Sequence, residues 1–196
     1  MSISVYLDPG HGEGVSGNYD PGAVGQGGLT ENEVAFDVAK RLAEILREQG
    51  FDVEGNTLAE ASDDENLNEA VRAANAAGVD LYVSLHCNSA VTAAAHGVEV
   101  WYGGSKTSIK VASAVLERIT AEFTDGEGIL NGRTLPLVAR GVKKGTFAVL
   151  RNTRMPAILV EMAFISNEQE EGWLRDYCVR QQFAQAIADG IIDAMG

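Results

Sequence analysis

Segments with the period of a β-strand alternate with segments with the period of an α-helix along most of this chain. Apolar side chains recur as in strands over residues 3–7, 51–54, 79–85, 97–102, 146–150 and 157–163, and as in helices over residues 31–49, 65–77, 106–123 and from about 168 onward. Such alternation is typical of layered α/β folds. We therefore predict a single α/β domain over residues 1–196, with a twisted, mostly parallel central sheet flanked by helices.

Three side chains that can carry chemistry fall at or near the ends of predicted strands. His11 follows the first strand, His86 ends the strand that begins at residue 79, and Glu161 lies near the end of the last strand. Ligands gather beyond the carboxyl ends of the strands in parallel sheets, so we expect these three residues to lie close together. His96 precedes a strand, and we assign it an ordinary polar role.

The stretch VYLDPGHGEG places His11 among three glycines within five residues. It does not match the dinucleotide-binding fingerprint, because Val15 stands where the third glycine is required, and the chain contains no P-loop sequence. We expect the glycines instead to let the backbone turn sharply and to leave room beside a bound ion or substrate.

The segment GLTENEVAFDVAKRLAEIL carries two carboxylates near its start, Glu31 and Glu33. At about 100° per residue, Glu31 falls on the apolar face of the predicted helix and Glu33 falls nearly opposite. Glu33 has another role available, because Thr30 and Glu33 form the pattern of a capping box. A hydrolytic zinc site has three protein ligands and one open position, so two histidines need a third ligand. An inward carboxylate is costly to bury without a partner or a cation, which favours Glu31 as that ligand.

Five strings occur in order between about residues 5 and 170: DPGHG, DPGAVG followed by Glu31, SLHCNSA, HGVEVWY and RGVKKGTFAVLRNTRMPAILVEMAFISN. Together they resemble the motifs of the zinc-dependent N-acetylmuramoyl-L-alanine amidases of the amidase-3 type, which are bacterial and phage cell-wall hydrolases. The resemblance implies one zinc ion (Zn2+) held by His11, Glu31 and His86, and a catalytic role for Glu161. It also implies that the substrate is peptidoglycan, cleaved between N-acetylmuramic acid and L-alanine.

The chain departs from the family pattern in two places. Residues 13–19 add length between DPGHG and DPGAVG, which we expect to reshape access to the site, and Cys87 stands where a small alanine is common. Neither change removes a ligand. We expect Cys87 to point away from His86, on the opposite face of the strand. Cys178 lies four residues after Leu174 on a predicted helical face, so we expect it to be buried.

Glu161 interrupts an otherwise apolar strand, AILVEM. Alternation places its side chain with Leu159 and Ala163, opposite Ile158 and Val160. Two roles remain open from the sequence. Glu161 either forms a buried ion pair, or takes a proton from an activated water and delivers it to the departing amine. In the second case zinc would activate the water and polarise the carbonyl.

The formal net charge of −13 disfavours polyanionic partners such as nucleic acid. No acidic residue occurs between Gly128 and Val160, however, and six basic residues fall there: Arg133, Arg140, Lys143, Lys144, Arg151 and Arg154. This stretch is either a solvated loop that balances an acidic body or a basic wall for an anionic substrate. On the second interpretation, Arg140, Lys143 and Arg151 bind carboxylates of the stem peptide.

No apolar run approaches the roughly 20 residues needed to span a bilayer, and the N-terminus lacks the pattern of a signal peptide. We expect a monomer, without membrane insertion, that acts on the bacterial cell wall and reaches it by phage lysis, another export route or a missing leader. Two other functions remain open. They are a zinc hydrolase that acts on a different amide, such as a peptide, and a catalytically silent wall-binding or regulatory module.

Overall fold

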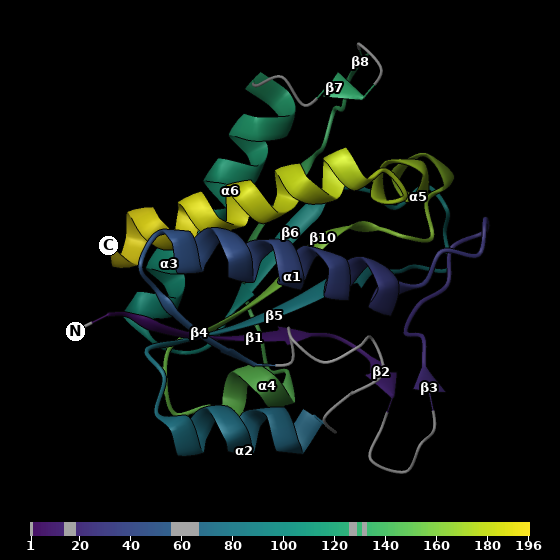
Figure 1. The fold of residues 1–196 in the computed structure, drawn as a ribbon. Helices are drawn as coiled ribbons and strands as arrows, with labels where there is room; N and C mark the ends of the chain where they lie inside the picture. Colours follow the sequence, from purple (N-terminus) through teal and green to yellow (C-terminus); the bar gives the residue numbers. More distant parts are fainter. Residues whose placement is uncertain (1, 14–18, 56–66, 126–128, 131–132) are drawn as a thin grey trace.

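A six-stranded sheet forms the centre of the fold (Figure 1). The structure is a computed structural model and describes residues 2–13, 19–55, 67–125, 129–130 and 133–196. The strand order is β4-β1-β5-β10-β6-β9, with the bounds Asp52–Gly55, Ser4–Pro9, Leu81–Asn88, Ala157–Phe164, Val98–Tyr102 and Ala139–Lys144. Strands β4, β1, β5 and β10 run parallel, β6 is antiparallel to β10, and β9 is parallel to β6. The predicted α/β fold with a mostly parallel sheet is confirmed.

Helices cover both faces of this sheet (Figure 1). One face is covered by α1 (Glu31–Glu48), α3 (Lys106–Thr120) and α6 (Tyr177–Met195), and the other by α2 (Leu67–Ala77) and the short α4 (Ala148–Arg151). Helix α5 (Glu168–Leu174) follows β10, and a π-helical turn (Ala121–Asp125) follows α3. Two small antiparallel pairs complete the fold: β2 (Gly12–Glu13) with β3 (Tyr19–Asp20), and β7 (Ile129–Leu130) with β8 (Arg133–Thr134).

Strand alternation divides the buried side chains between two cores. Val83 and Val160 belong to the larger core, with α1, α3 and α6, whereas Tyr82 and Leu159 belong to the smaller core beside α2 and α4. The smaller core stops partway along the strands. Beyond it, towards the carboxyl ends, alternation gives the same face the polar side chains Asp8, Ser84, His86 and Glu161. The fold therefore leaves a polar area at the carboxyl edge of the sheet.

The strand predicted over residues 146–150 is wrong, because Phe147 is the N-cap of α4 and the residues after it belong to that helix. Four apolar residues in a row fit a buried strand or a helical turn equally well, and here Val149 and Leu150 pack into the smaller core. The edge position belongs instead to β9, which the sequence analysis did not predict. Its sequence, ARGVKK, is largely polar, which suits a strand at the edge of the sheet whose side chains are exposed or only partly buried. Residues 65 and 66 of the predicted second helix lie outside the described residues.

The predicted single helix from residue 168 is also wrong, because the segment forms two helices. Helix α5 ends at Leu174 with Arg175 as its C-cap, and the Asp176 side chain caps α6 by accepting a hydrogen bond from the Cys178 backbone N–H at 2.8 Å. The break changes the helical phase between Leu174 and Cys178. Cys178 is consequently exposed, contrary to our expectation, whereas Leu174 is buried.

Gly190 generates a prediction about packing between α6 and α3. A Cβ atom there would lie 2.5 Å from the Val115 Cα atom and 2.7 Å from its nitrogen, which are backbone atoms that cannot rotate away. We expect Gly190→Ala to lower the free energy of unfolding by about 1–3 kcal/mol, despite the better helix propensity of alanine.

Gly172→Ala in α5 is the matched control, because its Cβ atom would meet nothing within 4 Å. It should be neutral or stabilising by up to about 1 kcal/mol. Denaturant unfolding measures both variants. Equal stability of wild type and Gly190→Ala would contradict the close approach of the two helices.

Candidate active site

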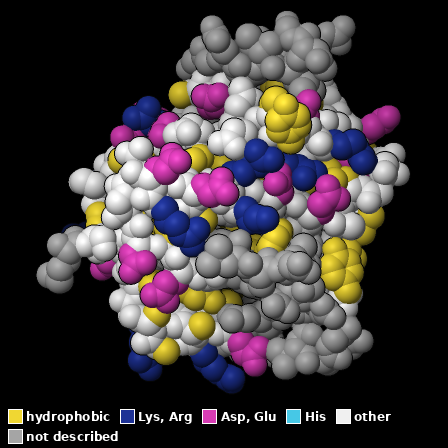
Figure 2. Space-filling view, in the orientation of Figure 1, with side chains coloured by type: hydrophobic (Ala, Val, Ile, Leu, Met, Phe, Trp, Pro, Cys, Tyr) yellow, Lys and Arg dark blue, Asp and Glu magenta, His cyan; other side chains and the backbone are white. Residues whose placement is uncertain are grey.

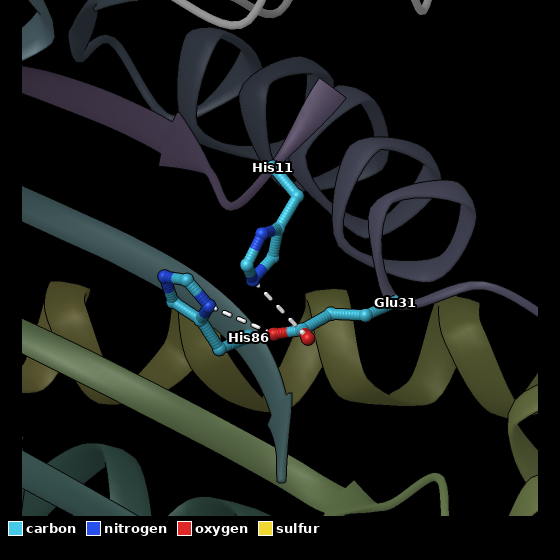
Figure 3. A group of neighbouring side chains, drawn as sticks. All are labelled: His11, Glu31 and His86. Carbon is cyan, nitrogen blue, oxygen red and sulfur yellow. Dashed lines mark hydrogen bonds and ion pairs between the residues drawn. The ribbon is translucent and has the colours of Figure 1, made fainter. Parts of the chain in front are cut away.

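His11, Glu31 and His86 lie together at the carboxyl edge of the sheet (Figure 3). His11 follows β1, His86 belongs to the neighbouring β5, and Glu31 is the first residue of α1. One candidate ligand atom from each lies within 4.8 Å of the other two. The Glu31 carboxylate lies between the two rings, with Oε2 3.2 Å from His11 Nε2 and Oε1 2.8 Å from His86 Nδ1. The structure thus brings the three predicted metal ligands together.

Two glycines make this close approach possible. A Cβ atom on Gly10 would overlap the His86 ring, and a Cβ atom on Gly22 would lie 2.5 Å from His11 Cδ2 and 2.7 Å from Glu31 Oε2. Gly22 also has a φ of 67°, in the left-handed region. His11 itself has a φ of 66°, which is uncommon for a residue with a Cβ atom. Gly10 therefore leaves room for the His86 ring, and its predicted role beside a bound ion or substrate stays a prediction.

Contacts within the group shift the pKa values of Glu31 and of both histidines towards their charged forms. Burial pushes the pKa of Glu31 upward, but its contacts with His11 and His86 outweigh burial and hold that pKa below its usual range. The contact with Glu31 raises the pKa of His11 to about 9. Burial lowers the pKa of His86, yet the contact with Glu31 outweighs it and raises that pKa. Two imidazoles and a carboxylate are a donor set that catalytic zinc sites use, and the cation would displace the shared protons. These residues therefore fit a zinc ion.

The ring nitrogens that face away from Glu31 also have polar partners, which the sequence analysis missed. Asp20 Oδ2 lies 2.9 Å from His11 Nδ1. Ser84 Oγ lies 3.1 Å from His86 Nε2 and donates a hydrogen bond to Asp8 Oδ2 at 2.8 Å. Such partners fix the ring orientation and the tautomer of a metal-binding histidine. Asp20 and Ser84 are therefore positioning residues for the two rings.

Glu161 lies beside this group, opposite His86 in the register of β5 and β10. Its Oε2 atom is buried and has no hydrogen-bond partner among the residues that the structure describes. Among the described residues Glu161 also forms no ion pair, which disfavours the interpretation that it is one half of a buried ion pair. Burial raises the pKa of Glu161 to about 7. A carboxyl group with such a pKa can both accept and donate a proton near neutral pH.

Glu99 is a further buried carboxylate that the sequence analysis missed. It lies opposite Glu161 in the register of β6 and β10, and its Oε2 atom is 2.7 Å from Arg140 Nε and 2.5 Å from Lys143 Nζ. Burial pushes the pKa of Glu99 upward, but the contacts with Lys143 and Arg140 outweigh it and lower that pKa. Two of the three predicted substrate-binding cations thus lie near the site but are paired with Glu99. The signal was present in VEVWY, where Glu99 interrupts an apolar strand as Glu161 does.

Two adjacent carboxylates of α5 fix the loops around the site. Glu171 is buried and accepts hydrogen bonds from the backbone N–H groups of Gly27 at 2.8 Å and Leu29 at 3.2 Å, just before α1 begins. Glu170 is also buried, and it accepts hydrogen bonds from the N–H groups of Gly97, before β6, and Phe164, at the end of β10. Both residues tie α5 to segments that carry site residues.

The remaining candidates lie away from the metal-ligand group. Arg151 belongs to α4 and lines a pocket at the opposite end of β10. His96 is exposed, with Nδ1 2.8 Å from the Ala94 carbonyl oxygen, which is consistent with the ordinary polar role that we expect for it. Cys87 is buried in the larger core, on the opposite face from His86, as predicted. Residues 14–18 of the inserted segment lie outside the described residues.

Comparison with known proteins decides the family. A family model described as N-acetylmuramoyl-L-alanine amidase matches residues 5–193. The chain belongs to this amidase family. The comparison with solved structures agrees: the amidase AmiC2 of Nostoc punctiforme superimposes with a TM-score of 0.81 and 31% identity, over 97% of this chain and 96% of that chain.

Two curated amidases are similar over nearly the whole chain. LytC of Bacillus subtilis is 32% identical over 193 residues, which cover 96% of this chain and 35% of LytC. AmiA of Escherichia coli is 30% identical over 226 aligned positions, which cover 96% of this chain and 74% of AmiA. The chain thus spans about a third of the length of one amidase relative and about three quarters of the other.

The contact between Asp20 and His11 generates a prediction about metal affinity. Asp20→Ala leaves His11 Nδ1 without its partner, so we expect zinc affinity to fall by roughly 10- to 100-fold. Asp52→Ala removes an exposed carboxylate of β4 and is the matched control, which should bind zinc as wild type does. Competition with a chromophoric chelator measures both. Unchanged affinity in Asp20→Ala would show that the ring needs no such support.

The unpaired carboxyl group of Glu161 generates a prediction about stability. Because folding raises its pKa from 4.5 to about 7, the folded chain holds this proton more tightly than the unfolded chain does. The associated stabilisation is present below about pH 4.5 and is lost as pH rises through about 7. Metal-free Glu161→Gln should therefore be more stable than metal-free wild type at pH 8, by about 1–3 kcal/mol, and the difference should shrink towards pH 4.5.

Glu54→Gln, an exposed change in β4, is the matched control for this measurement and should show no such pH-dependent gain. Denaturant unfolding in the presence of a chelator, at several pH values, gives the comparison. A wild type that is more stable than Glu161→Gln at pH 8 would indicate that Glu161 has a charged partner after all.

Proposed function

We propose that this chain is a zinc-dependent N-acetylmuramoyl-L-alanine amidase, a peptidoglycan hydrolase that cleaves the amide between N-acetylmuramic acid and the L-alanine of the stem peptide. One observation carries the proposal. The donor group of His11, Glu31 and His86 lies beside the buried, unpaired carboxyl group of Glu161. Membership of the amidase family supports the identity of the bond.

His11, Glu31 and His86 would hold the zinc ion, which supplies a Lewis acid that polarises the amide carbonyl and lowers the pKa of a water molecule. Glu161 acts as the general base and then as the general acid. As a carboxylate it accepts the proton of the attacking water, and as an acid it donates that proton to the departing amine nitrogen. The position of Glu161 opposite His86 and its pKa of about 7 in the metal-free site support both steps.

Arg140 and Lys143 contact carboxylates of the stem peptide in this proposal. Their side chains are 36% and 33% exposed, so each can reach a ligand while Glu99 holds it in place. Glu99 itself pairs in register with Glu161, which puts the two cations close to the reacting bond. Pairing with Glu99 also keeps both cations oriented before substrate arrives, which reduces the loss of side-chain entropy on binding.

The proposed setting is the bacterial cell wall, where residues 1–196 act as one monomeric catalytic domain. Among the described residues, no helix combines the length and the apolar character that crossing a bilayer requires. The net charge of −13 disfavours binding to nucleic acid. Membership of the amidase family supports peptidoglycan as the macromolecular partner of the site.

Digestion of purified peptidoglycan, followed by mass analysis of the soluble products, tests the proposal. The expected products are intact stem peptides with a free L-alanine amino group. Cleavage within the peptide or within the glycan would contradict it. Glu161→Gln should retain zinc and lower kcat by about 10²- to 10⁴-fold, the usual contribution of general acid–base catalysis. A zinc-loaded Glu161→Gln variant with full activity would remove the proposed role of this residue.

A further inference from the structure

A second pocket, at the opposite end of β10 from Glu161, concentrates positive charge that the proposed reaction does not use. Its volume is about 450 Å³, which is within the range of small-ligand sites. Three basic residues line it, Lys144, Arg151 and Arg154, and the described lining contains no acidic residue. The pocket is therefore positively charged, in a chain whose net charge is −13.

None of the three cations of this pocket has an acidic partner among the described residues, whereas six other basic side chains form ion pairs there: Arg41, Arg118, Arg140, Lys143, Arg175 and Arg180. On the face formed by α1 and α6, basic and acidic side chains lie next to one another (Figure 2), and Arg41 and Arg180 form ion pairs with Asp37 and Glu33. In the pocket, Lys144, Arg151 and Arg154 share one lining that contains no acidic residue among the described residues, so a bound anion would be attracted by all three.

Hydrogen bonds between distant segments fix the walls of the pocket. The Gly103 N–H donates to the Ala157 carbonyl at 2.9 Å, and the Gly145 N–H donates to the Tyr102 carbonyl at 3.1 Å. The Arg154 N–H donates to Asn75 Oδ1 at 2.8 Å, which anchors the loop after α4 to α2. Because these contacts form within the protein itself, the pocket is largely shaped before a ligand binds, which reduces the entropy lost on binding.

We propose that this pocket is an oxyanion-binding site, for a carboxylate or a phosphate group, separate from the metal centre. The guanidinium groups of Arg151 and Arg154 match the geometry of either group, because each can donate two parallel hydrogen bonds to a pair of oxygens. Lys144 adds a third charge, and the Thr146 hydroxyl offers a further hydrogen-bond donor in the lining.

The position of the pocket suggests where a carboxylate would come from. Ala157, at the pocket end of β10, and Glu161 are four residues apart in one strand, which corresponds to about 13 Å. Because Leu159 and Tyr82 are buried between the two sites, a peptide that joins them must run over the surface, and it needs at least about four extended residues. A stem peptide that is cleaved beside Glu161 could thus place a distant carboxylate in the pocket, and this source rests on the proposed function. The alternative is a phosphate group, and that source does not depend on the proposed function.

Titration of the isotope-labelled, zinc-loaded chain, followed by amide NMR shifts, tests the inference. The probes are inorganic phosphate and the dipeptide L-alanyl-D-glutamate, with sodium chloride at equal ionic strength as the reference. We expect saturable shifts of the Gly103, Gly104 and Gly145 amides with at least one probe. A response to phosphate alone identifies the phosphate source, and a response to the dipeptide identifies the carboxylate source.

Arg151→Gln combined with Arg154→Gln should weaken this binding by at least about tenfold, because two charge-assisted contacts are lost. The matched control, Lys40→Gln with Arg72→Gln, removes two exposed charges elsewhere and should bind as wild type does. Shifts confined to the metal centre, shifts that persist in the arginine double variant, or no saturable shift with either probe would overturn the inference. The readout is binding, so it remains valid even if peptidoglycan digestion contradicts the proposed function.

Discussion

The buried carboxylate of Glu31 is the interaction on which the site depends. Only 5% of the residue is exposed, so its negative charge requires compensation. Its oxygens accept hydrogen bonds from the backbone N–H groups of Ala23 at 2.9 Å and Cys87 at 3.1 Å, and they lie between the rings of His11 and His86. One side chain thereby joins the end of β1, the end of β5 and the start of α1. A divalent cation would take over the compensation that shared protons provide in its absence.

The rest of the carboxyl edge serves to keep this carboxylate and its neighbours in place. Parallel pairing of β1, β5 and β10 puts His86 and Glu161 side by side, and the absence of a Cβ atom at Gly10 and Gly22 lets the rings approach. Asp20 and Ser84 orient the two rings from behind, and Glu170 and Glu171 anchor the adjoining loops to α5. Polar groups thus replace apolar packing on this part of the sheet, and the larger core on the other face supports them.

Periodicity predicted where residues of the candidate site lie, because each of them departs from a local pattern. Helical phase separated the inward Glu31 from the outward Glu33, whose side chain pairs with Arg180 while its N–H donates to the Thr30 cap. The described contacts include this hydrogen bond of the predicted capping box but not the reciprocal one, from the Thr30 N–H to the Glu33 side chain. Features that depend on partners distant in sequence were not predictable. Glu99 finds Arg140 and Lys143 only through the pairing of β6 with β9, and the polar sequence of β9 carries no strand period. The Asp176 cap likewise overrode a helical pattern that continued across it.

The central claim is that the inward Glu31, and not its neighbour Glu33, is a metal ligand. Zinc content per chain, measured by elemental analysis of purified wild type, Glu31→Gln and Glu33→Gln, tests this claim most directly. The two substitutions remove the same charge two residues apart on one helix, and Glu33 is exposed, so its loss should affect stability by at most about 1 kcal/mol. The account predicts one zinc ion per chain in wild type and Glu33→Gln and almost none in Glu31→Gln. Full zinc content in Glu31→Gln, or loss of zinc in a folded Glu33→Gln, would contradict it.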